Sequence, residues 1–318
     1  MESHEHRPAW KTLLAFAIIY FVWGTTYLAI RVGVQEVPPF LLAAMRFSIA
    51  GAVLYGWMIA HGEPSPTARQ WMGASTIAIF IFVLDYGVLF WAEQRVPSGV
   101  TAVMMATIPV FIAFLEIMLL RTQRLSLRLA LALLIGIAGV AVLMSRSLNL
   151  SGAPIDRMGA LALLVASIGW SFGTVLTRKV DLPPSKVMSS GAQMLAGGIF
   201  LALAAAALGE FRGFHISAVS RGAWLALLYL IVAGSIIGFT AYVWLIHHES
   251  PTKVGTYAYV SPVVAVLVGY FLGGEALGLR TILGTLFVLA SVVVITSTRA
   301  ERPPAPLPVG DPAKAEGS

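Results

Sequence analysis

Apolar residues run along this chain in about ten stretches, each long enough to cross a bilayer as a helix. A helix rises about 1.5 Å per residue, so about twenty residues span the hydrocarbon core of a membrane. The segments between the stretches are short and polar or contain proline, and none could hold a soluble domain. The pattern predicts an all-α, polytopic membrane protein with spans at residues 11–31, 39–60, 71–92, 97–120, 126–145, 158–177, 187–208, 222–246, 252–273 and 279–298.

The second half of the chain repeats landmarks of the first half in the same order. Trp23 and Trp170 lie 147 positions apart, and so do Arg31 and Arg178. An odd number of spans in each copy requires the second copy to enter the membrane from the opposite side, and inverted repeats of this kind place a binding site near the midplane. Chance similarity between helices rich in Leu and Ala is the alternative explanation. The two predicted five-helix units cover residues 11–145 and 158–298.

Composition and charge narrow the class of protein further. The chain is 58% hydrophobic and 11% charged, whereas soluble domains carry about 25% charged residues. Its net charge of +6 fits cytoplasmic loops, and no segment could form the basic, soluble face that nucleic-acid binding needs. The distribution of Lys and Arg predicts that both termini are cytoplasmic, with residues 1–10 and the proline-rich, disordered residues 299–318 as tails. Cysteine is absent, which excludes disulfides and thiolate chemistry.

Several short motifs occur in a fixed order: Trp23-Gly24, Ala44-Met45-Arg46-Phe47, Pro109, Pro262 and the stretch Gly273-Gly274-Glu275-Ala276-Leu277. In these motifs, over about residues 12 to 298, the chain resembles the ten-helix EamA-type exporters of the drug/metabolite transporter superfamily. The chain departs from the family at Gln123, where the family often has Glu. The resemblance implies efflux across a bacterial inner membrane, and within the superfamily it is strongest to exporters of amino acids, including aromatic amino acids, and related metabolites.

Ionisable residues inside a membrane are costly and therefore require an explanation. Arg46 and Asp85 each lie about eight residues from the same end of neighbouring spans, about 12 Å deep. We therefore predict a buried ion pair between them, which would offset the cost of desolvating both charges. Two roles remain open: the pair fixes helix packing, or Asp85 accepts a proton or faces a substrate amine. Glu116 lies beside Arg121 and is predicted to be interfacial.

Aromatic and hydroxyl residues recur inside the predicted spans. Trp23 and Trp170 are each followed by small residues, a pattern that suits the wall of a cavity and also suits tight helix packing. Pro109 and Pro262 are predicted to kink the fourth and ninth spans and to free backbone carbonyls; the alternative is that the kinks only shape the bundle. The predicted substrate-pathway residues are Trp23, Tyr27, Asp85, Tyr86, Met104, Thr107, Trp170, Thr174, Tyr242, Tyr257, Tyr259 and Ser261.

Together these patterns predict a secondary transporter that exports amino acids or related small metabolites by alternating access. A proton-coupled exporter of drugs or toxic compounds is the alternative, and an intramembrane enzyme is an alternative of another class. The sequence indicates no catalytic residues, no metal and no cofactor, and it has neither a P-loop nor a zinc-protease motif. The expected partners are a small-molecule substrate and the lipid bilayer. The oligomeric state stays open, a monomer being one option.

Overall fold

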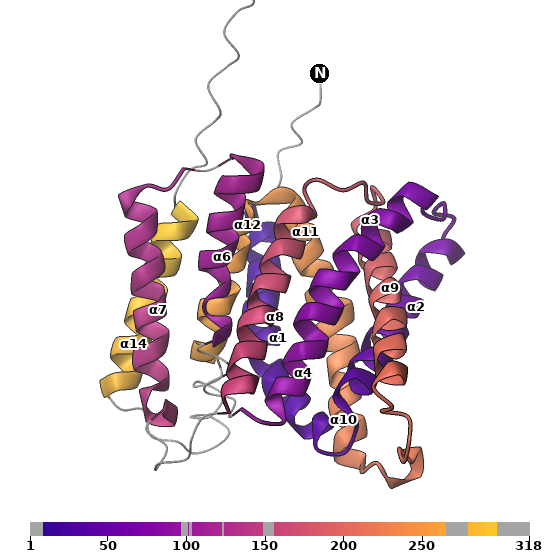
Figure 1. Cartoon of the computed structure of the whole chain (residues 1–318). Coiled ribbons are helices and arrows are strands. Elements are labelled where there is room, and N and C mark those ends of the chain that lie inside the picture. Colours follow the sequence, from indigo (N-terminus) through magenta and orange to yellow (C-terminus); the bar gives the residue numbers. More distant parts are fainter. Residues whose placement is uncertain are drawn as a thin grey trace, which may run out of the picture.

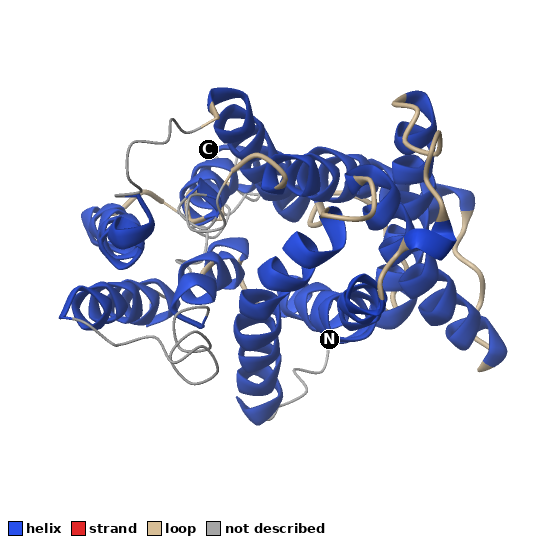
Figure 2. Cartoon of the chain, turned by 90° about the horizontal axis from the view of Figure 1, so that it is seen from below, coloured by secondary structure: helices blue, strands red, loops and turns tan. Residues whose placement is uncertain are grey.

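The computed structural model describes residues 9–96, 101, 104–122, 124–148, 156–264 and 279–297, and this part of the chain contains helices and turns but no strand (Figure 2). Helix is present in each of the ten predicted spans. Residues 1–8 of the predicted N-terminal tail, the whole C-terminal tail, Gln123 and the stretch 273–277 fall outside the described residues, whereas Ala9 and Trp10 of the N-terminal tail begin the first helix. Within the described ranges, six helices are long and apolar enough to cross a membrane: Ala9–Val34, Pro39–Ala60, Ala68–Glu93, Arg157–Leu176, Lys186–Ala207 and Arg221–His248.

Two of these long helices contain a π-helical segment in the middle. In chain order the elements are α1 (Ala9–Val34), α2 (Pro39–Ala60), α3 (Ala68–Ala78), η1 (Ile79–Gly87), α4 (Val88–Glu93), α6 (Ile108–Leu115), η2 (Glu116–Leu120), α7 (Leu127–Leu148), α8 (Arg157–Leu176), α9 (Lys186–Ala207), η3 (Ile216–Ala218), α10 (Arg221–Tyr229), η4 (Leu230–Phe239), α11 (Thr240–His248), α12 (Pro251–Gly255) and α14 (Leu279–Ser297). The π segments η1 and η4 occupy the centres of the α3–α4 and α10–α11 helices. Such segments are rare, and they occur often at functional sites.

The first helices of the two halves cross the bundle in opposite directions. We call the end of the bundle at which α1 begins and α14 ends the upper face, and the end at which α1 stops and α8 begins the lower face (Figure 1). Polar caps fix several of the starts: the side chain of Asp156 accepts from the backbone of α8, and that of Ser220 from the backbone of α10. This arrangement is the inversion that an odd number of helices per repeat demands.

Helix pairing follows the repeat. The second helices of the two halves, α2 and α9, pack on each other, and so do the last helices, α7 and α14, which stand at one edge of the bundle (Figures 1 and 2). Likewise α1 packs along the α10–α11 helix, while its counterpart α8 packs along the α3–α4 helix. The described helices are therefore related by an approximate two-fold exchange of the two halves.

Polar contacts between the two halves occur at both faces, and they are related by the same two-fold exchange. After α1, the carboxylate of Glu36 accepts hydrogen bonds from the backbone N–H (2.6 Å) and the hydroxyl (2.7 Å) of Ser220, at the start of α10. These bonds stabilise the ionised carboxylate and lower the pKa of Glu36. After α8, Asp181 pairs with Arg69 near the start of α3, at 3.6 Å. The first helix of each half is thus tied to the third helix of the other half, on opposite faces.

Burial is arranged as expected for a protein in lipid. Large apolar side chains such as Phe21, Leu28 and Val53 are exposed on the outside. The hydrocarbon core of a membrane accommodates an apolar surface of this extent. Small residues let α2 and α9 approach closely: a Cβ built on Gly51 would lie 2.4 Å from the backbone N of Leu195. Close approach of this kind is a general route to helix association in membranes.

We expect Gly51→Ala to destabilise the protein by about 1–3 kcal/mol, because the added methyl group would force α2 away from the backbone of α9. Gly56→Ala is the matched control, since it lies on the same helix and a Cβ there meets nothing within 4 Å. Thermal unfolding of both variants in detergent measures the difference. Equal melting temperatures for the two variants would contradict the close α2–α9 contact.

Candidate functional site

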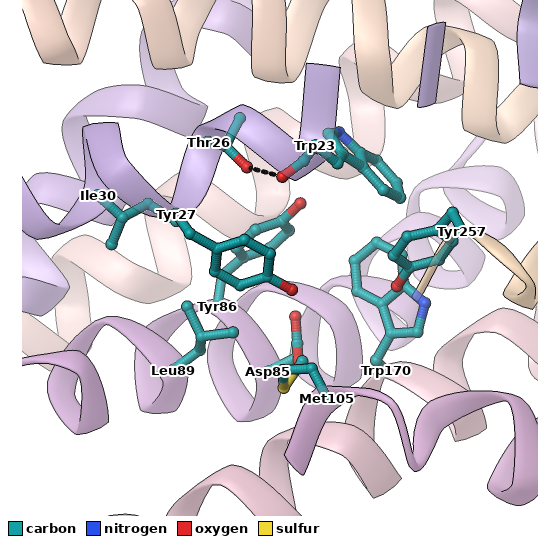
Figure 3. A pocket seen from close by; sticks show the side chains of 10 residues that line it. All are labelled: Trp23, Thr26, Tyr27, Ile30, Asp85, Tyr86, Leu89, Met105, Trp170 and Tyr257. Carbon is teal, nitrogen blue, oxygen red and sulfur yellow. Dashed lines mark hydrogen bonds between the residues drawn. The ribbon is translucent and has the colours of Figure 1, made fainter. Parts of the chain in front are cut away.

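A narrow cavity lies inside the bundle between the two halves (Figure 3). Its free volume is only about 30 Å³, which is room for about two water molecules. The side chains that line it come from α1, the α3–α4 helix, α8, the segment before α6 and the segment after α12. They are Trp23, Thr26, Tyr27, Ile30, Asp85, Tyr86, Leu89, Met105, Trp170 and Tyr257. Six of the predicted pathway residues are among them.

Four aromatic side chains enclose one end of the cavity. The ring centroid of Trp23 lies 4.7 Å from that of Tyr257, 5.3 Å from that of Trp170 and 5.4 Å from that of Tyr242. Trp170 in turn lies 5.0 Å from Tyr242. Several of these pairs meet edge to face, a geometry in which aromatic rings attract each other beyond simple burial. This aromatic cluster, Trp23, Trp170, Tyr242 and Tyr257, joins helices from both halves.

The two tryptophans differ in their hydrogen bonding. The indole N–H of Trp23 donates to the carbonyl of Gly234 in the π segment η4, at 3.0 Å. The indole N–H of Trp170 is buried and finds no hydrogen-bond partner among the described residues. A buried donor without a partner is costly, so the N–H of Trp170 is a donor that a bound solute or water could satisfy.

A buried carboxyl faces the same cavity. Asp85 lies on η1 with 2% of its surface exposed, and its Oδ1 has no hydrogen-bond partner in the described part of the chain. Figure 3 shows this carboxyl and the hydroxyl of Tyr27 turned into the same space. The cavity therefore combines an unsatisfied acceptor and an unsatisfied donor with aromatic walls.

The predicted salt bridge between Arg46 and Asp85 is not formed. Arg46 is fully buried on α2, its Nε donates to Ser235 Oγ at 2.8 Å, and its guanidinium lies over the rings of Phe47 (4.6 Å) and Tyr86 (4.9 Å). Cation–π contacts stabilise a buried guanidinium without a carboxylate in contact. Asp85 remains a Coulombic partner of Arg46 at longer range. The side chain of Asp85 is thus left available to the cavity.

The other predicted pathway residues fall into two groups. Thr174 shares a 2.5 Å hydrogen bond with the hydroxyl of Tyr242 and so supports the aromatic cluster from behind. The hydroxyls of Thr107 and Ser261 donate to the backbone carbonyls of Met104 and Tyr257. The hydroxyl of Tyr259 donates to the carbonyl of Leu133, on α7. The structure therefore does not bring Met104, Thr107, Tyr259 and Ser261 to the cavity wall.

The two kinks predicted at prolines are placed differently in the two halves. Pro109 lies in the first turn of α6, directly after a break at Thr107. In the second half the corresponding break is at Thr256, six positions before Pro262, which lies within helical residues 257–264. Both threonine hydroxyls donate to the carbonyl three residues earlier, at 2.6 Å. Hydroxyl-capped turns at Thr107 and Thr256 are the feature that the two halves share.

Two further carboxyl groups are buried. Glu116, which is predicted to be interfacial, is buried within the protein near the end of its helix, and it accepts from the backbone N–H (3.0 Å) and the hydroxyl (2.6 Å) of Thr252 at the start of α12. Glu93 is buried at the lower end of the α3–α4 helix, and neither of its oxygens has a hydrogen-bond partner among the described residues. Sequence reasoning did not single out Glu93, although its spacing of eight residues from Asp85 places both on one helical face.

No group of three or more His, Cys, Asp or Glu side chains that could hold a metal ion occurs in the described ranges.

Known proteins that resemble this chain define its fold and its family. A solved crystal structure superposes with a TM-score of 0.73 at 23% identity, covering 91% of this chain and 97% of that chain, which establishes the fold. The sequence model of the EamA-like transporter family matches twice, at residues 10–145 and 157–297. The chain therefore belongs to the EamA-like transporter family and is a polytopic membrane transporter of small molecules.

Among curated proteins, the chain is 37% identical over 299 residues to the uncharacterized inner membrane transporter YedA of Escherichia coli K12, covering 93% of each chain. It is 28% identical to the protein PecM of Dickeya dadantii, covering 86% of this chain and 88% of that one. The uncharacterized transporter sll0355 of Synechocystis is 27% identical, with 87% of each chain covered. The two matches of the family model bear out the internal repeat that was predicted from the tryptophan and arginine spacing.

We expect Trp23→Phe to lower the free energy of unfolding by about 1 kcal/mol more than Trp170→Phe does, because only Trp23 loses an indole hydrogen bond. The two changes remove the same atoms from one aromatic cluster, so each serves as the control for the other. Denaturant unfolding in detergent measures both losses. Equal losses would contradict the difference in hydrogen bonding between the two tryptophans.

Proposed function

We propose that the protein is a secondary transporter of the inner membrane that exports amino acids or related small metabolites by alternating access. One observation carries this proposal: a cavity between the two inverted halves combines aromatic walls with one carboxyl oxygen and one indole N–H that lack hydrogen-bond partners among the residues that the structure describes. Binding sites for small solutes are typically apolar pockets with a few placed polar groups. The names of related proteins, which include inner membrane transporters, agree with this location.

The unsatisfied groups define the solute that suits the cavity. Asp85 would accept hydrogen bonds from a solute amine, and a charge-assisted bond of this type is about twice as strong as a neutral one. The indole N–H of Trp170 would donate to an acceptor on the same solute. The aromatic rings favour an apolar part and attract a cationic amine through their faces. An amino acid with a sizeable apolar side chain carries all three features.

Buried side chains stand on both sides of the cavity, where an alternating-access cycle needs its barriers. Towards the upper face the aromatic cluster covers it, and towards the lower face Ile30 and Leu89 are buried in its wall. Its free volume is too small for an amino acid, so one of these two barriers has to open before a solute can enter. The exchange of the two halves supplies two related barriers, which is the basis of rocking in inverted-repeat transporters.

Proton coupling is the second candidate, and the environment of Asp85 favours it. A buried carboxylate without a hydrogen-bond donor or a salt bridge takes up a proton more readily than a paired carboxylate does. Proton-coupled export of drug-like cations would use the same cavity, with the solute and the proton alternating on Asp85.

Counterflow in proteoliposomes tests the proposal with three solutes that share a phenyl ring: phenylalanine, 2-phenylethylamine and 3-phenylpropionate. We expect exchange of the amine-bearing solutes, and we expect Asp85→Asn to reduce it by about tenfold or more, which corresponds to one charge-assisted hydrogen bond. Asp181→Asn is the matched control, since it changes the same chemical group in an exposed pair that contributes little.

Two comparisons in this assay decide between the candidates. A pH gradient that drives accumulation in the native protein, and fails to do so in Asp85→Asn, indicates proton coupling. An exchange rate that is the same with and without the pH gradient indicates facilitated export. Unchanged flux of 2-phenylethylamine in Asp85→Asn would contradict a role for this carboxyl in either scheme.

A further inference from the structure

The face of the α3–α4 helix that carries Asp85 continues towards the lower face of the protein. Asp85, Leu89 and Glu93 follow each other at intervals of four residues, so their side chains lie on one side of this helix. Asp85 and Leu89 line the central cavity, whereas Glu93 lines a second pocket directly below it. On the opposing helix α1, Ile30 lines the cavity and the next residue, Arg31, lines the second pocket.

This second pocket, which we call the outer pocket, is lined by Arg31, Val34, Gln35, Glu93 and Gln94. Its free volume is about 150 Å³, five times that of the central cavity. It shares Val34, Gln35 and Gln94 with a wider hollow that also contains Glu36 and Glu210. Spaces along one seam between α1 and the α3–α4 helix therefore widen stepwise from Asp85 to the lower face.

Glu93 is the unusual group in this outer pocket. Its side chain belongs to a residue with 4% of its surface exposed, and both carboxyl oxygens lack a hydrogen-bond partner among the described residues. Arg31 carries the opposite charge and lines the same pocket, yet it does not hydrogen-bond to Glu93. By contrast, the buried carboxylate of Glu116 is satisfied by two bonds from Thr252 and one from Thr122. An unsatisfied buried carboxyl is expensive unless it takes up a proton or binds a ligand.

We propose that Glu93 forms a second binding site for the amino group of the solute, on the route between the central cavity and the lower face. Glu93 takes up the amine after it leaves Asp85, and Arg31 lies on the other side of the pocket, where it suits the carboxylate of a zwitterion. Ile30 and Leu89 form the apolar barrier that separates the two sites. This inference rests on the proposed function for the direction and class of the solute, but its test does not depend on transport.

The absence of native cysteine allows a single reporter thiol to be introduced directly. Gln35→Cys places it at an exposed position that lines both the outer pocket and the wider hollow. In protein held in lipid nanodiscs, we expect 2-phenylethylamine to slow modification of this thiol by a methanethiosulfonate reagent about tenfold at saturation. Adding Glu93→Gln should abolish this protection, and adding Asp85→Asn should preserve it. The anionic probe 3-phenylpropionate should give weaker protection.

Ser217→Cys, an exposed position on η3, serves as a control thiol that the amine should not protect. No protection of Gln35→Cys in the otherwise native protein, or equal protection with and without Glu93→Gln, would overturn the outer site. Loss of protection in Asp85→Asn as well would also overturn it, because a single central site would then explain the binding. If protection behaves as expected while counterflow is absent, the outer site stands and the proposed export function fails.

Discussion

The fold depends on one contact more than on any other: the indole of Trp23 against the π segment η4. Its N–H donates to the carbonyl of Gly234, and Gly238 keeps the space for the ring, since a Cβ there would lie 2.7 Å from the indole nitrogen. The same ring packs on Trp170, Tyr242 and Tyr257. In a membrane, where exposed polar backbone is not tolerated, this contact joins the two halves and covers one end of the cavity at once.

The repeat supplies a symmetric scaffold, but the polar chemistry on it is asymmetric. At the 147-residue spacing, Trp170 corresponds to Trp23 and Gly87 to Gly234, yet within the described part of the chain the indole of Trp23 has a hydrogen bond and that of Trp170 has none. Arg46 corresponds to Gln193, whose amide donates to Ser189 on its own helix at 3.0 Å, and Asp85 corresponds to Val232. Among the described residues that line the cavity, the carboxyl group thus comes from the first half, which gives a nearly two-fold pathway a chemically distinct side.

A buried guanidinium and two buried carboxyls make the first half costly to fold. Arg46 is accommodated in part by Ser235, by aromatic faces and by the space at Gly234, where a Cβ would lie 2.8 Å from its Nη2, although Nη1 and Nη2 have no hydrogen-bond partner among the described residues. In the same part of the chain, Oδ1 of Asp85 and both carboxyl oxygens of Glu93 also lack a hydrogen-bond partner. Groups that the scaffold leaves unsatisfied are the ones that a solute, a proton or water can use, and these two carboxyls lie along one seam that leads to the lower face.

The sequence by itself determined the number and type of the helices, the internal repeat and the family, because hydropathy, spacing and motif order are local or one-dimensional signals. It also gave twelve candidate pathway residues, because the repeat and the membrane together restrict where inward-facing aromatic and charged groups can lie. The tertiary structure selected six of them, Trp23, Tyr27, Asp85, Tyr86, Trp170 and Tyr257, as the lining of one cavity. Only the tertiary structure decided the partner of Arg46, the break at Thr256 and the isolation of Glu93. Those outcomes depend on which side chains from distant helices come within about 3 Å of each other, a distance finer than any periodicity along the chain can fix.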